Sequence, residues 1–217
     1  IRYRYGPFTT GGAINLVSTP VPKKFTARLN ASFGSFATGK AYARVGNGGK
    51  YGGWLVEYLH YRSNGFRHSQ DHEEMGFRRH DLNTKFLVQT ANEDGINHRL
   101  TLKFGYAQEH SDETYLGLSE ADFARSPYLR SPAAQRDDLT TRHQQWAATY
   151  VLDGGYRWKV TTQLYYNRFF RNWYTLNDVR TGVWSGQKHS IGDVLAEPDM
   201  LSEAFALVQG AKSYDGE

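Results

Sequence analysis

Hydrophobic and polar residues alternate with a period of two along most of residues 25–171. In the stretch FTARLNASF, Phe25, Leu29 and Phe33 fall on one face, and Arg28 and Asn30 fall on the other. Successive side chains of a strand point to opposite sides, so this pattern predicts β-strands with one apolar face. The alternation, weaker in the second and third stretches, predicts seven strands, at residues 25–33, 36–45, 51–62, 82–90, 98–109, 142–152 and 156–171.

The connections between these strands differ in length at the two strand ends. Residues 47–49, 92–95 and 153–155 combine Gly with Asn or Asp, which is typical of tight hairpin turns. The alternate connections begin with the short segment 34–39 and then lengthen, to 63–80, to 110–141 and to the residues from 172 onward. Short turns at one end and long loops at the other are typical of outer-membrane barrels. The sequence therefore predicts an all-β chain whose antiparallel, up-and-down strands form part of a transmembrane β-barrel.

Aromatic residues make up 15% of the chain. They gather at two levels, as expected for the girdles at the two membrane interfaces. Tyr51, Trp54, Tyr156 and Trp158 lie near the short turns, whereas Tyr166, Phe169, Phe170, Trp173 and Tyr174 lie near the long loops. The mean hydropathy of −0.66 fits such a barrel, because only every second strand residue meets lipid.

Charge and reactive residues exclude several function classes. Lys and Arg number 26 and Asp and Glu 22, without a basic cluster, so we expect no nucleic-acid partner. Cysteine is absent, which excludes a disulfide scaffold and a cysteine nucleophile. The chain contains no Gly-x-Ser-x-Gly motif, and we expect no catalytic residue. Residues 68–80, HSQDHEEMGFRRH, lack His-Glu-x-x-His spacing, so we interpret them as a solvated loop and expect no metal site or cofactor.

The first 20 residues carry a different, glycine-rich pattern. Residues 2–20 read RYRYGPFTTGGAINLVSTP, in which the motif residues are Arg4, Tyr5, Gly6, Pro7, Gly11, Gly12 and Asn15. This stretch resembles the end of the plug domain of TonB-dependent outer-membrane receptors. Residues 64–67, NGFR, and 115–123, YLGLSEADF, are similar to loop segments of the ferric citrate receptor-like group.

The resemblance implies both an architecture and an activity. Residues 1–22 would be the C-terminal end of the plug and its linker, and residues 23–217 the N-terminal part of a barrel of about 22 strands, with its extracellular loops. The family imports a ferric chelate, such as ferric citrate or another siderophore, across the bacterial outer membrane. TonB supplies the energy by binding a plug segment upstream of this chain, and outer-membrane lipid surrounds the barrel. In this view the strands at 25–33 and 156–171 are unpaired edges.

Arginines in the long loops are the candidate ligand-binding residues. Ferric chelates are often anionic, and the planar guanidinium group pairs with carboxylates through two hydrogen bonds. The candidates are Arg130, Arg136, Arg142, Arg171 and Arg180. The alternative is that they are solvated or paired with Asp137, Asp138 and Asp178. We expect the basic residues of the strands to face the lumen and the plug: Arg28, Lys40, Arg44, Lys85, Lys103 and Lys159.

The last loop has a helical pattern in residues 193–209. Leu201, Ala204, Phe205 and Val208 share one face, and Asp199 is positioned to cap the helix. Two alternatives to the importer remain open at this point: a soluble carbohydrate-binding β-sandwich, and an outer-membrane barrel enzyme.

Overall fold

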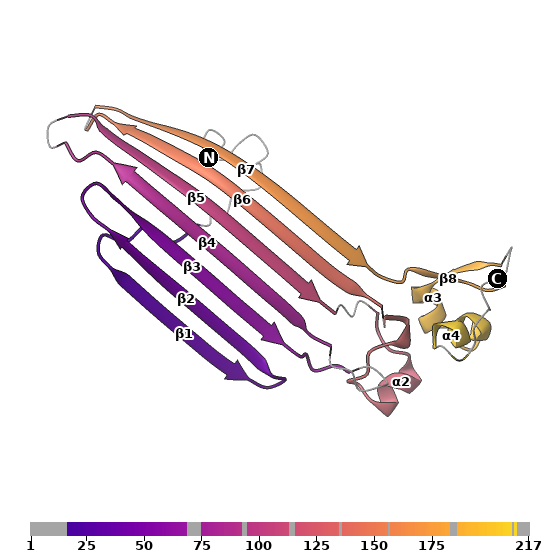
Figure 1. Cartoon of the computed structure of the whole chain (residues 1–217). Helices are drawn as coiled ribbons and strands as arrows, with labels where there is room; N and C mark the ends of the chain where they lie inside the picture. Colours follow the sequence, from indigo (N-terminus) through magenta and orange to yellow (C-terminus); the bar gives the residue numbers. More distant parts are fainter. Residues whose placement is uncertain are drawn as a thin grey trace.

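The chain folds into one seven-stranded antiparallel sheet with small helices beyond one end (Figure 1). The computed structural model describes residues 17–68, 75–92, 95–112, 116–134, 136–155, 157–182, 186–209 and 211. Each strand pairs with its neighbours in the sequence, which confirms the all-β, up-and-down prediction. The strands are β1 (Thr26–Gly34), β2 (Thr38–Gly48), β3 (Gly52–Ser63), β4 (Phe77–Gln89), β5 (Asn97–Ser111), β6 (Asp138–Asp153) and β7 (Lys159–Tyr174). The plug motif, Arg4 to Asn15, lies outside the described residues.

The strand register gives the sheet one apolar and one polar face. Across the middle of the sheet, Trp54, Phe86, Leu102, Ala148 and Leu164 are successive cross-strand partners and share the apolar face. The predicted lumen-facing cations occupy the opposite, polar face: Arg28 is the partner of Arg44, Lys85 is the partner of Lys103, and Lys40 and Lys159 have the same orientation. The predicted assignment of these basic residues to the face opposite the apolar side chains is therefore confirmed.

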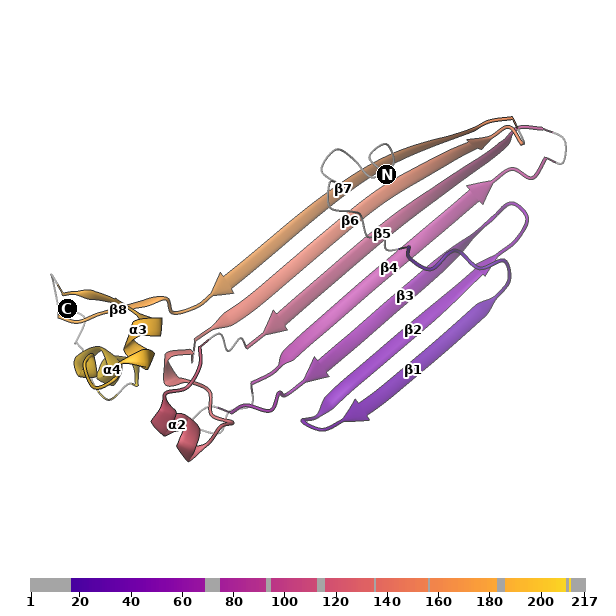
Figure 2. The same cartoon turned by 180° about the vertical axis from the view of Figure 1, so that it is seen from behind.

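The apolar face is uncovered. Leu29 is 77% exposed and Leu164 70%, and large aromatic side chains between them are also exposed. Within the described ranges no second sheet and no helix packs on this face, and both views show the sheet as a single layer (Figures 1 and 2). Nearly all of the fully buried apolar residues lie in the loops, with Leu55 as the exception in the strands.

The two outer strands of the sheet are β1 and β7, as predicted. β1 pairs only with β2, and β7 only with β6, so the sheet is open. The connections 49–51, 90–96 and 154–158 lie at one end of the sheet, and 35–37, 64–76, 112–137 and the residues after 174 lie at the other.

Several predicted boundaries and orientations were wrong. β4 begins at Phe77, so residues 77–80 of the predicted solvated loop belong to a strand. In β7, Tyr166, Phe170 and Tyr174 share the apolar face, but Phe169 and Trp173 point to the polar face. Three of the five aromatic residues predicted near the long loops therefore share the apolar face, because strand alternation sends adjacent aromatic residues to opposite sides.

The loops contain short helices, namely α2 (Glu120–Arg125), the 3-10 helix η1 (Pro132–Ala134), α3 (Ile191–Ala196) and α4 (Ser202–Val208), and a hairpin of β8 (Asp178–Arg180) and β9 (Lys188–Ser190). The helix predicted at 193–209 is two helices. Its predicted cap was wrong: Leu201, not Asp199, precedes α4, and no side chain caps it. None of the helices in the described parts of the chain is long and apolar enough to cross a membrane.

Candidate ligand-binding site at the loop end of the sheet

The two longest loops pack against each other and form one folded unit beyond the sheet. Leu116, Ala133 and Ala134 of the loop 112–137 share a buried cluster with residues of the last loop. These are Ile191, Val194, Ala204 and Val208, with Leu201 and Phe205 packed against them, so the predicted apolar face of α4 is confirmed. Gln209 Nε2 also donates to Asp122 Oδ2 over 2.9 Å. This unit thus has a small apolar core, which fixes the relative positions of its polar residues.

Arg130 and Asp137 lie buried where this unit meets the sheet. The side chain of Arg130, 2% exposed, donates to the backbone oxygen of Asp137 over 2.8 Å and to Met75 Sδ over 3.3 Å. The Asp137 carboxylate accepts a hydrogen bond of 3.1 Å from the Leu176 N–H. Burial raises the pKa of Asp137 above its ordinary value, although that hydrogen bond and the charge of Arg130 act in the opposite direction. Both residues therefore hold the loops together.

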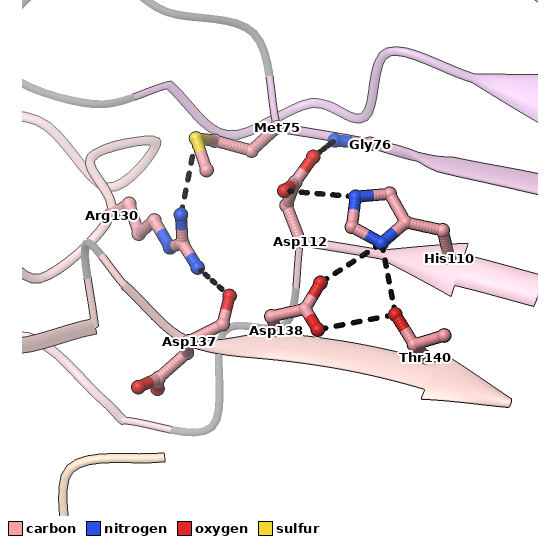
Figure 3. A network of polar contacts seen from close by, with 8 residues as sticks. All are labelled: Met75, Gly76, His110, Asp112, Arg130, Asp137, Asp138 and Thr140. Atoms are coloured by element: carbon pink, nitrogen blue, oxygen red, sulfur yellow. Dashed lines mark hydrogen bonds and ion pairs between the residues drawn. The ribbon is translucent and has the colours of Figure 1, made fainter. Parts of the chain in front are cut away.

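A second polar network fastens the loop bases to β5 and β6 (Figure 3). His110 Nδ1 lies 2.9 Å from Asp138 Oδ2, and Thr140 Oγ1 donates to the other oxygen of Asp138. On its other side, His110 Nε2 lies 4.0 Å from Asp112, whose carboxylate accepts from the Gly76 N–H over 3.3 Å. One histidine thereby joins the start of β6 to the segment that precedes β4.

A cavity of about 320 Å³ lies between the loop 112–137, the end of β7 and α4. Its lining includes Arg136, Tyr174, Leu176, Val208 and Gln209. Arg136 is exposed, and no described residue forms a hydrogen bond or ion pair with its guanidinium group. The lining combines the Arg136 guanidinium group with apolar side chains and with Asp137, and the guanidinium group is the part suited to a small anionic ligand. Of this lining, Arg136 was predicted from the sequence as a candidate ligand-binding residue. The proximity of Gln209 and Tyr174 has no signal in the sequence.

The other predicted arginines are dispersed. Arg130 is buried and does not line the cavity, and Arg180 is exposed on β8. Arg171 lies on the polar face of β7, with its guanidinium carbon 5.5 Å from the ring centre of Trp173. Arg142 lies on the apolar face, opposite in orientation to Arg171. Asp138 pairs with His110, and Asp178 pairs with Lys188, so neither aspartate is the carboxylate partner of these arginines.

Farther down the polar face, the segment 17–24 lies across the strands (Figure 2). Glu57 accepts hydrogen bonds from Thr19 Oγ1, Tyr42 Oη and Asn83 Nδ2 over 2.8, 2.7 and 2.6 Å. Lys85 Nζ donates to the carbonyl oxygen atoms of Ser18 and Thr19. The chain preceding β1 is therefore held on the polar side of the sheet.

No group of three potential metal ligands occurs among the residues with a described position. Part of the histidine-containing string falls outside them, since residues 69–74 are not described. Comparisons with protein-family models, with curated proteins and with solved structures found no match to this chain.

Proposed function

We propose that this chain forms part of the wall of a TonB-dependent outer-membrane receptor that imports a ferric chelate, such as ferric citrate or another siderophore. The observation that carries the proposal is the uncovered apolar face of the antiparallel sheet, opposite a polar face that holds the preceding segment. A soluble sandwich would cover the apolar face with a second sheet, and in the described residues the only other sheet, the β8–β9 hairpin, does not pack on it.

Under this proposal the apolar face contacts hydrocarbon and the polar face lines the lumen. Unpaired backbone groups in hydrocarbon cost several kcal/mol each. Further strands therefore pair with the free edges of β1 and β7 in the complete barrel. Residues 1–22 form the end of the plug, and the hydrogen bonds of Glu57 and Lys85 hold its exit segment against the wall.

The folded loops form the extracellular mouth, where the chelate binds first. Arg136 at the cavity pairs with carboxylates of the anionic chelate, and Arg180 and Arg171 supply further positive charge at the approach. The receptor makes and breaks no covalent bond in its cargo. TonB, acting on a plug segment upstream of this chain, releases the plug from the polar face and opens the path inward.

The test is a binding titration with the complete receptor that contains this chain, purified in a neutral detergent. Ferric citrate is titrated against tryptophan fluorescence, with iron-free citrate as the reference. Arg136→Gln removes the cavity charge, and Arg157→Gln removes an exposed arginine at the short-turn end of the sheet.

A charge-assisted hydrogen bond contributes about 1.5–3 kcal/mol, so Arg136→Gln should weaken binding roughly 10- to 100-fold. Arg157→Gln should bind like the wild type. Wild-type quenching that does not depend on iron would refute the proposed cargo. Equal binding by the two variants would refute the role of Arg136.

A further inference from the structure

The loop end of the apolar face carries arginines without acidic partners. Arg62, Arg78, Arg142 and Arg168 all share this face by register, and all four are exposed. Arg62 and Arg78 are direct cross-strand partners, an arrangement of like charges that destabilises a sheet unless a counter-charge is bound. None of the four forms a hydrogen bond or ion pair with a described residue.

The acidic residues of the large sheet lie elsewhere. Glu57, Asp81, Glu109 and Asp153 have the orientation of the polar face. Asp138 has the orientation of the apolar face, but His110 already pairs with it at 2.9 Å. By contrast, Arg79 on the polar face has two carboxylate partners, Asp81 at 2.9 Å and Glu109 at 3.2 Å. Arg79 is thus neutralised on the polar face, whereas none of the four arginines on the apolar face has a carboxylate partner among the described residues.

Two of these arginines line a concave site. A cavity of about 280 Å³ opens on β5, β6 and β7, and its lining is Tyr106, Arg142, Gln144, Arg168 and Phe170. Arg168 is the cross-strand partner of Gln144, and Arg142 is the partner of Phe170, so the two guanidinium groups come from diagonal positions on neighbouring strands. Side chains at such positions lie close enough to contact one small anion together.

An apolar groove lies next to this cavity, farther from the loops. It has a volume of about 420 Å³ and is lined by residues that include Leu102, Trp146, Leu164 and Tyr166. Trp146 follows Gln144 on the same face of β6, and Tyr166 precedes Arg168 on the same face of β7. The cationic cavity and the apolar groove therefore form one continuous amphipathic surface.

We infer that Arg142 and Arg168 bind the phosphate headgroup of an anionic lipid whose acyl chain lies in the adjacent groove. This inference rests on the proposed membrane position of the sheet. The guanidinium fork matches phosphate oxygens bidentately, and basic residues at headgroup depth attract anionic lipid. A free phosphate ion would leave the groove unused, whereas a lipid fills both parts of the surface.

The experiment uses the complete receptor in dodecyl maltoside micelles and counts bound lipid by native mass spectrometry. The probe is diphosphoryl lipid A, and the comparison ligands are an uncharged diacylglycerol and inorganic phosphate. The test variant is Arg142→Gln/Arg168→Gln. The control variant is Arg28→Gln/Arg44→Gln, which removes a cross-strand arginine pair from the polar face. Heat-modifiable gel migration shows whether each variant is a folded barrel.

The wild type and the control variant should retain lipid A at least tenfold more tightly than the test variant, and the difference should shrink in high salt. Diacylglycerol should bind all three proteins weakly and alike. Equal lipid A affinity in folded wild type and test variant would overturn the inference and leave the receptor proposal intact. Displacement of lipid A by equimolar inorganic phosphate would show a free-anion site and also overturn it. A receptor that is soluble without detergent would refute both proposals.

Discussion

Leu164→Arg places a charge on the proposed lipid-facing surface and therefore tests that assignment most directly. From Trp158 at the short-turn end to Leu164, the strand runs about 20 Å at about 3.3 Å per residue. With a strand tilt of about 40°, this corresponds to about 15 Å of height, near the middle of an apolar band about 25 Å tall. Leu164 is 70% exposed on the apolar face, so Arg fits sterically and the cost is electrostatic.

An arginine at the midplane of a barrel costs about 2–4 kcal/mol. The free energy of unfolding of the complete receptor in lipid vesicles, measured by urea titration, should fall by this amount for Leu164→Arg. Gln163→Arg places the same charge one residue away on the polar face and should change it by about 0.5 kcal/mol or less. Equal costs at the two positions, or a tolerated Leu164→Arg, would refute the assignment of the apolar face to hydrocarbon.

Three further predictions concern the plug exit and the loops. Lys85→Met removes the donor to the Ser18 and Thr19 carbonyl groups, so protease cleavage within residues 18–24 should accelerate while the sheet stays folded; unchanged cleavage would contradict the docking role. Ile191→Ala, at a side chain only 1% exposed, should destabilise the loop unit by about 2–4 kcal/mol and speed hydrogen exchange in α3 and α4; exchange like that of the wild type would contradict the loop core. Because burial raises the pKa of Asp137 above its ordinary 3.8, protonation stabilises the loops fully below that pH, and this contribution disappears as the pH rises through the raised pKa; Asp137→Asn should flatten this part of the pH dependence of loop proteolysis, and an unchanged profile would show that another group controls it.

The strands were predictable because the period of two is a local property of the sequence. The prediction was weakest where this signal is masked, as at the start of β4, where Arg78 and His80 occupy positions of the apolar face. The face on which Arg142 lies could also be predicted from the sequence, because Arg142 has the same even-numbered parity as Trp146 and Ala148. Its position beside the connection 110–141 suggests a place among the loop arginines, whereas the register places it on the apolar face of β6.

The site in the loops depends on packing that the sequence pattern does not report. Arg130 is buried because it contacts Asp137 in its own loop and Met75 in a loop far away in the chain. Ser190 caps α3, because its hydroxyl accepts from the Asp193 N–H, and this residue type before the helix is a local signal that a prediction could have used. The contact of Gln209 with Asp122 bridges the two loops and has no sequence signature at all.

The most direct test of the central claim is a nitroxide scan along β7 in the complete receptor, reconstituted in lipid vesicles. This chain contains no cysteine, so single cysteines at residues 160–166 can be labelled individually without interference from another thiol in it. The account predicts that oxygen, which partitions into lipid, reaches the labels at even positions, and that a water-soluble nickel chelate reaches those at odd positions. An accessibility profile without a period of two, or with the two relaxation agents exchanged, would contradict it.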